Sequence, residues 1–254
     1  MLHQFPKPEN VTPEIKQRFV GIATRMADEG AAGFGEIALL HLALVPKHPF
    51  EETSPQHPLM LALCEVAGQR DLVIDLHMDP VPAQDFVKTP SYLKSPPNPP
   101  RLQGNIAAFE KLLAHERKAR IVWAHGGSDF TGAMTPALVG RLMDAHPNLF
   151  MSLRPVPSGV VTVPAFGLRF NNTIMPGAGI EKAWLALLQK HADRFVLGAD
   201  AFFIAPSAPG DSPLRTLGRG NEMRLRAVEQ LLSRLPAPLA AKIASENAMR
   251  LYHL

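Results

Sequence analysis

Five short apolar segments recur along the chain, and they constrain the fold more than any other feature. They are "GFGEIALL" within residues 32–40, "LVIDLH" (72–77), "RIVWAH" (120–125), "LFMSLR" (149–154) and "RFVLGAD" (194–200). The segments are apolar almost throughout and do not alternate with polar residues, which is typical of strands buried on both faces of a parallel sheet.

Helical patterns separate these predicted strands. Amphipathic spacing and capping signals predict helices over 13–29, 54–70, 105–119, 135–147 and 180–193, with two more over 220–234 and 237–251. Thr12, Ser54 and Thr135 are the expected N-caps of three of them. Regular strand–helix alternation predicts an α/β fold, either an open doubly wound sheet or a (β/α)8 TIM-type barrel. Proline-rich stretches at 80–102 and 155–178 read as long loops that shape a pocket.

Four of the predicted strands end in a residue that can bind a metal ion. "GFGE" ends in Glu36, "LVIDLH" in His77, "RIVWAH" in His125 and "RFVLGAD" in Asp200. The carboxyl ends of parallel strands lie on one face of a sheet or barrel, so these side chains are expected to converge there. Imidazole nitrogen and carboxylate oxygen are the ligands that suit zinc or a similar divalent ion at a catalytic site.

Each of these residues, taken singly, has a structural interpretation. A single histidine at a strand end more often forms a hydrogen bond in the core or at the rim, Asp200 could cap a turn, and Glu36 could form a salt bridge. The recurrence of metal-binding residue types at four strand ends favours the site. Asp79 and Asp129, which follow the two histidines, either orient an imidazole or cap a loop, and Asn247 reads as a structural contact.

Composition excludes several other classes of protein. The chain has 254 residues, of which 46% are hydrophobic and 19% charged, as expected of a globular protein. Its net charge of +3 is scattered, so nucleic acid is not an expected partner. No apolar run is long enough to span a membrane, and the N-terminus lacks a secretory signal pattern. With its single cysteine, Cys64, the sequence fits a cytoplasmic protein.

The motifs that carry these residues resemble the amidohydrolase superfamily. "GFGEIAL", "DLVIDLHMDP", "IVWAHGG", "FVLGADAF" and "KIASENAMRLY" are similar to its successive core motifs, most closely those of the amidohydrolase-related (amidohydrolase 2 type) metal-dependent hydrolases with a TIM-barrel fold. The glycine–glutamate pair also resembles the TatD-type hydrolases. The resemblance runs from about residue 13 to residue 254.

This resemblance implies a role for each candidate residue. His77 and His125 would be the histidines of the fifth and sixth barrel strands, Asp200 the eighth-strand metal ligand and general base, and Glu36 the fourth-strand ligand. The His-x-His of the superfamily's first strand has no counterpart here. We therefore expect one domain over 1–254 that corresponds to an incomplete barrel, the fourth to eighth βα units, without the N-terminal portion.

The resulting expectation is a metal-dependent hydrolase that acts on a small-molecule amide, ester or lactone. His125 and Asp200 are the expected catalytic residues, the metal ligands are His77, His125, Asp200 and Glu36, and Arg154 at the end of "LFMSLR" is a candidate for binding a substrate carboxylate. Three alternatives remain open: non-oxidative decarboxylation of an aromatic acid, a TatD-like nuclease, and an inactive remnant. A homo-oligomer is also left open.

Overall fold

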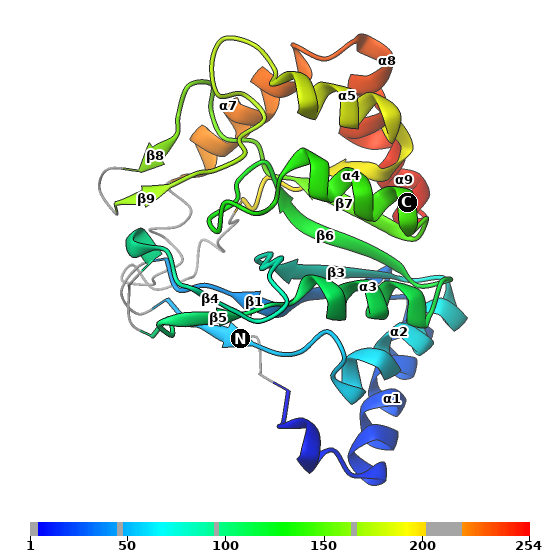
Figure 1. The fold of residues 1–254 in the computed structure, drawn as a ribbon. Helices are drawn as coiled ribbons and strands as arrows, with labels where there is room; N and C mark the ends of the chain where they lie inside the picture. Colours follow the sequence, from blue (N-terminus) through cyan, green and yellow to red (C-terminus); the bar gives the residue numbers. More distant parts are fainter. Residues whose placement is uncertain (1–4, 45–47, 94–96, 164–166, 202–219) are drawn as a thin grey trace, which may run out of the picture.

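The fold is built on a six-stranded sheet in the order β10-β7-β6-β3-β1-β2 (Figure 1). The computed structural model describes residues 5–44, 48–93, 97–163, 167–201 and 220–254. The five predicted strands are all present, and each pairs in parallel with the next predicted strand along the chain. The short β2 is antiparallel to β1. Their bounds are β1 Gly33–His41, β2 Glu51–Glu52, β3 Val73–Met78, β6 Arg120–Gly126, β7 Leu149–Leu153 and β10 Phe195–Leu197.

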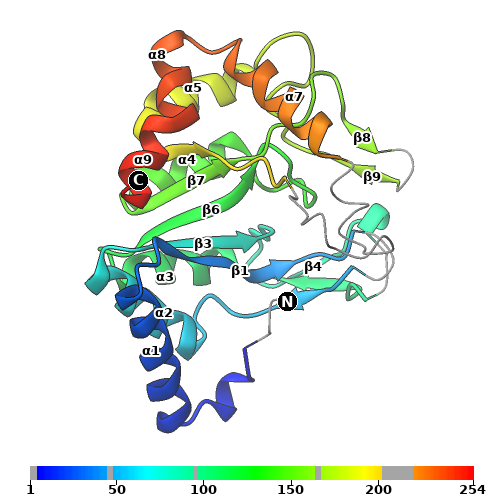
Figure 2. The ribbon, with the colours of Figure 1, turned by 180° about the vertical axis from the view of Figure 1, so that it is seen from behind.

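A helix connects each parallel strand to the next one. These connections are α2 (Pro58–Arg70), α3 (Ile106–His115), α4 (Pro136–Ala145) and α5 (Lys182–Lys190), and α1 (Pro13–Asp28) precedes β1. Helices α3 and α4 lie in front of the sheet in Figure 1 and behind it in Figure 2, so they cover one face. Strands that follow each other in order, with their helices on one face, wind as in part of a (β/α)8 barrel rather than as in a doubly wound sheet. The sheet is not closed over the described residues, in agreement with the predicted incomplete barrel.

The main hydrophobic core fills the space between the sheet and these helices. Its largest fully buried side chains include Trp123 on β6, Phe109 on α3 and Trp184 on α5. A smaller cluster lies on the opposite face, where Leu251 of α9 (Asn247–Tyr252) packs with the three strand residues Val73, Val122 and Val196.

The C-terminal segment is held beneath the last strand by Asn247. The remaining helices are α7 (Asn221–Leu232), α8 (Ala237–Ala241) and a π-helical turn (Lys242–Glu246) that leads into α9. The Asn247 side-chain amide donates to the carbonyl oxygens of Ala192 and Phe195, both at 2.8 Å. The predicted structural role of Asn247 is confirmed. Among the described residues, none of the helices has both the length and the apolar character needed to cross a bilayer.

Three local predictions were wrong. Helix α2 begins after His57, whose Nδ1 accepts a hydrogen bond from the Leu59 amide, so Ser54 is not its N-cap. The two predicted loops contain short antiparallel pairs, β4 (Phe86–Lys88) with β5 (Arg101–Gln103) and β8 (Thr162–Val163) with β9 (Leu168–Arg169). Asn105 fixes the first loop to the sheet, because its side chain bonds the Val81 amide and the Asp79 carbonyl.

Strand β1 contains a close backbone approach that only glycine permits. A Cβ atom at Gly35 would lie 2.7 Å from Asp75 Cβ and 2.9 Å from the Asp75 carbonyl oxygen on the neighbouring strand. A methyl group there would force β1 away from β3 at the residue that precedes Glu36.

We therefore expect Gly35→Ala to lower the free energy of unfolding by about 1–3 kcal/mol, the usual effect of overpacking. Gly21→Ala is the matched control, because a Cβ at Gly21 in α1 meets nothing within 4 Å and the change removes a mid-helix glycine, so stability should be equal or slightly higher. Urea denaturation of both variants measures the difference. Equal stability of Gly35→Ala and the unsubstituted protein would contradict the close approach.

Candidate metal centre

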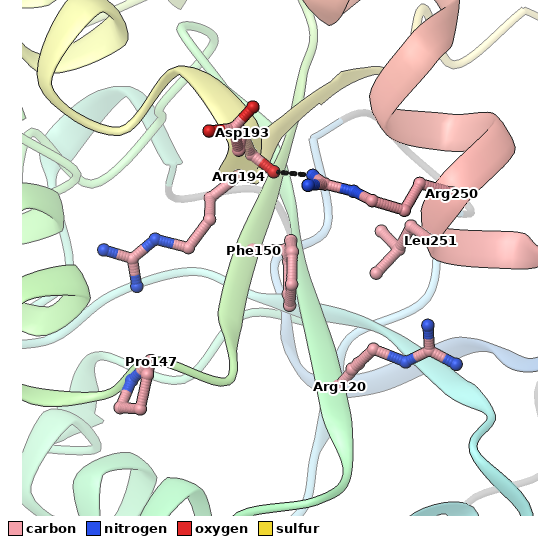
Figure 3. A pocket seen from close by; sticks show the side chains of 7 residues that line it. All are labelled: Arg120, Pro147, Phe150, Asp193, Arg194, Arg250 and Leu251. Carbon is pink, nitrogen blue, oxygen red and sulfur yellow. Dashed lines mark hydrogen bonds between the residues drawn. The ribbon is translucent and has the colours of Figure 1, made fainter.

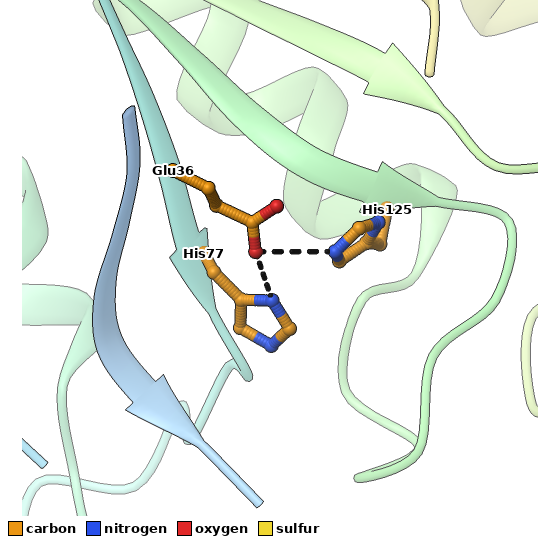
Figure 4. Close-up of side chains that lie close together, drawn as sticks. All are labelled: Glu36, His77 and His125. Atoms are coloured by element: carbon orange, nitrogen blue, oxygen red, sulfur yellow. Dashed lines mark hydrogen bonds and ion pairs between the residues drawn. The ribbon is translucent and has the colours of Figure 1, made fainter. Parts of the chain in front are cut away.

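Three predicted ligands meet at the carboxyl-end side of the sheet. Glu36 on β1, His77 on β3 and His125 on β6 each offer one atom, and these atoms all lie within 4.8 Å of one another. Glu36 Oε1 lies 2.7 Å from His77 Nδ1 and 3.4 Å from His125 Nε2, so one carboxylate oxygen faces both imidazoles (Figure 4). Over the described residues this is the one such group of histidine, cysteine and acidic side chains.

Two β-bulges aim these side chains. The pairing of β1 with β3 shifts between Phe34 and Ile37, around Glu36. The pairing of β6 with β7 shifts between Trp123 and Gly126, around His125, whose φ of 72° lies in the left-handed region. Bulges redirect a side chain relative to a regular pleat, and strained backbone is concentrated at functional sites. Glu36 lies inside β1, which continues to His41, so the prediction that Glu36 ends its strand was wrong.

The charges of the three residues depend on one another. Burial raises the pKa of Glu36, but hydrogen bonds from His125 and His77 outweigh it and hold this pKa far below its usual range. Burial lowers the pKa of His77, but Asp79 and Glu36 outweigh it and raise this pKa to about 9. Burial and the positive His77 lower the pKa of His125. A proton on His77 thus supplies the positive charge that the buried carboxylates require.

Asp79 holds the outer nitrogen of His77. Its Oδ2 lies 3.6 Å from His77 Nε2 and accepts a hydrogen bond from the Leu42 amide at 3.1 Å, so the aspartate both caps a strand end and faces the imidazole. Asp129 instead caps its own loop, because its carboxylate accepts bonds from the amides of Thr131 and Met134.

Asp200 and Arg154 form a pair next to this cluster. Arg154 Nη2 lies 3.2 Å from Asp200 Oδ2, and Asp200 has a φ of 52° three residues after β10. Arg154 lines a small cavity of about 10 Å³ together with His77, Asp79 and His125. Asp200 is therefore brought to the same rim through Arg154, but it is not among the three residues whose ligand atoms converge.

Two further histidines, His41 and His48, extend the cluster. The His41 ring lies 4.7 Å from the His77 ring and 4.6 Å from the His48 ring. Burial and neighbouring His77 lower the pKa of His41 to about 4. His48 is half-buried, and its Nδ1 accepts a hydrogen bond from the Leu44 amide. His41 is the last residue of β1, which places it at the same edge of the sheet as His77.

Comparisons with known proteins find distant similarity to solved structures. No family model and no curated protein matches the chain. Solved structures that resemble it include a Campylobacter jejuni dihydroorotase (16% identity, 92% of this chain and 62% of that chain, TM-score 0.48) and a Saccharomyces cerevisiae dihydroorotase in complex with 5-fluoroorotic acid (10%, 96% and 66%, 0.47). A Burkholderia multivorans amidohydrolase with bound zinc matches at 16% identity, over 79% of this chain and 59% of that chain, with a TM-score of 0.42.

The chain thus spans about three fifths to two thirds of the length of these structures. The identities are at most 16%, and all three TM-scores are below 0.5.

The coupling between Glu36 and His77 is measurable in metal-free protein. In Glu36→Gln, the pKa of His77 should fall from about 9 toward 6.5, because one of the two carboxylates that stabilise its imidazolium is gone. Glu65→Gln is the control, since Glu65 pairs with His115 outside the cluster. Two-dimensional NMR of the imidazole rings, recorded against pH with chelator present, follows this change. A His77 pKa that stays near 9 in Glu36→Gln would refute the coupling.

Proposed function

We propose that this rim binds a divalent cation and hydrolyses an amide, ester or lactone of a small molecule. The observation that carries the proposal is the convergence of Glu36, His77 and His125 ligand atoms within 4.8 Å. One carboxylate and two imidazoles form the donor set of a catalytic zinc site with an open position, which supports zinc as the ion.

The surroundings of the three residues fit a cation. The low pKa of Glu36 keeps its carboxylate ionised, and the raised pKa of His77 keeps a proton on that imidazole. Metal binding displaces such ligand protons, so a cation can take over the electrostatic role of the proton on His77. The Asp79 carboxylate facing His77 Nε2 is the arrangement that orients a metal-binding imidazole. The cavity beside His77 and His125 has the size of about one water molecule or ion.

In this proposal, each residue of the rim has one task. A bound divalent ion would supply a Lewis acid that polarises a carbonyl and makes water nucleophilic at neutral pH. Glu36, His77 and His125 hold the ion, and Asp79 holds His77 in orientation. Asp200 accepts the proton of the attacking water and returns it to the leaving group. Arg154, whose guanidinium faces the same cavity, binds a substrate carboxylate.

Metal content tests the ligand set. We expect His77→Ala, after zinc loading and desalting, to retain at least tenfold less zinc than the unsubstituted protein, because a ligand is lost. His115→Ala is the control, since His115 is a partly exposed histidine paired with Glu65 on another part of the surface. Elemental analysis of equal amounts of folded protein gives the ratio. Equal zinc content in His77→Ala and His115→Ala would rule out the proposed ligand set.

Asp200 is separable from the ligands by kinetics. We expect Asp200→Asn to keep its zinc and to lose about 10²–10⁴-fold in kcat, the usual contribution of a general base. Arg154→Gln should raise KM for carboxylate-bearing substrates and leave neutral ones unchanged. A panel of small esters, lactones and cyclic amides provides the assay. Zinc loss in Asp200→Asn would instead make Asp200 a ligand, as the sequence resemblance implies, and unchanged kcat would exclude both roles.

A further inference from the structure

A second cavity opens at the opposite end of the sheet from the candidate metal centre. Its volume is about 330 Å³, within the range of small-molecule sites. Residues at the amino ends of three strands line it: Arg120 of β6, Phe150 of β7 and Arg194 just before β10. Arg250 and Leu251 of α9 close one side (Figure 3).

The lining carries an excess of positive charge. It contains the three guanidinium groups of Arg120, Arg194 and Arg250 and a single carboxylate, that of Asp193. Lys242 forms a salt bridge with the Asp193 carboxylate at 2.7 Å and adds one positive charge. Asp71 forms a salt bridge with Arg120 at 2.9 Å and adds one negative charge. These pairings leave a net charge of about +2 around the cavity, which favours an anion.

The arginines are held in place by the protein and keep donors free for a ligand. Arg250 donates to the Asp193 carbonyl, and Arg194 Nη1 donates to the His146 carbonyl at 3.1 Å. Arg120 donates to the Asp71 carbonyl through Nη2. Nη2 of Arg120 also contacts His253 Nε2 at 2.9 Å, and Nη2 of Arg250 also donates to Asn247 Oδ1 at 3.2 Å. Nη2 of Arg194 contacts His191 Nδ1. Each guanidinium has five N–H groups, and Nη1 of Arg120 and Nη1 of Arg250 have no partner among the described residues. A carboxylate would therefore meet preorganised donors.

The floor of the cavity is apolar and contains an aromatic ring. Phe150 lies between the three arginines in Figure 3, and it is only partly buried. Leu251 and Pro147 complete the apolar surface. A flat ring can stack on Phe150, and guanidinium planes also stack on aromatic faces.

We propose that this cavity is a binding site for a small aromatic carboxylate. The ring lies over Phe150, and the carboxylate accepts hydrogen bonds from the guanidinium groups at the rim. The site is separate from the metal centre: Arg120 and His125 occupy opposite ends of β6, and five residues of strand span roughly 16 Å. A ligand that fills one site therefore does not reach the other.

Titration calorimetry with 2-naphthoate, against the isosteric neutral 2-naphthamide, tests the proposal on the full chain. We expect 2-naphthoate to bind with at least tenfold lower Kd than 2-naphthamide. Arg250→Gln should weaken 2-naphthoate about tenfold, and Arg250→Lys should weaken it less, since the charge remains. Phe150→Leu should reduce the preference for 2-naphthoate over cyclohexanecarboxylate.

Two variants distinguish this site from other modes of binding. Arg226→Gln removes an exposed arginine of α7 that pairs with Glu222, and it should leave the Kd unchanged. His77→Ala should also leave it unchanged, because the metal centre is not involved. Thermal melting confirms that each variant is folded. Loss of binding in His77→Ala, equal effects of Arg250→Gln and Arg226→Gln, equal affinity for 2-naphthamide, or no binding at all would each overturn the proposal.

Discussion

The shared carboxylate of Glu36 is the interaction on which the candidate metal centre depends. A partly buried carboxylate needs a positive partner, since desolvation disfavours its charged form. His77 and His125 provide that partner from two neighbouring strands, and their hydrogen bonds keep Glu36 ionised. The influence spreads further along β3. Burial and the charge of Glu36 raise the pKa of Asp75 to about 6. The positive His77, which faces the same side of the sheet, lowers this pKa but does not outweigh them.

The parallel sheet makes this interaction possible, because it gathers residues that are far apart in the sequence. Glu36 and His125 are separated by almost ninety positions in the printed sequence, yet the adjacent pairing of β1, β3 and β6 sets them side by side. The bulges then set the direction in which the side chains of Glu36 and His125 point. A regular pleat would fix the facing of each side chain by its parity along the strand, whereas one inserted residue in β1 and one in β6 redirect Glu36 and His125 toward His77.

The sequence predicted the strands and helices well because burial on both faces leaves a direct pattern. Short apolar runs such as "LVIDLH", alternating with helical patterns, favour strands in the interior of a parallel sheet. The winding of those strands into part of a barrel was also accessible, since sequential strand–helix units have few arrangements.

What escaped prediction depended on contacts between distant segments. His57 rather than Ser54 starts α2, because both residues have capping side chains and only the path of the chain decides between them. The strand predicted within 32–40 matches β1, but Glu36 was wrongly placed at a strand end, because a bulge leaves little trace in an apolar pattern. His41 lies beside His77 because β1 pairs with β3, and His48 lies beside His41, two contacts that no local pattern specifies.

The two ends of the same sheet differ in charge for a physical reason. At the carboxyl end, carboxylates from Glu36, Asp79 and Asp200 face histidines and Arg154, so a cation can replace a proton in the network. At the amino end, Arg120, Arg194 and Arg250 outnumber the acidic groups around Phe150. The buried valines of β3, β6 and β10, covered by Leu251, form an apolar layer between these two regions. One sheet can therefore support two polar sites because its apolar middle insulates each from the other.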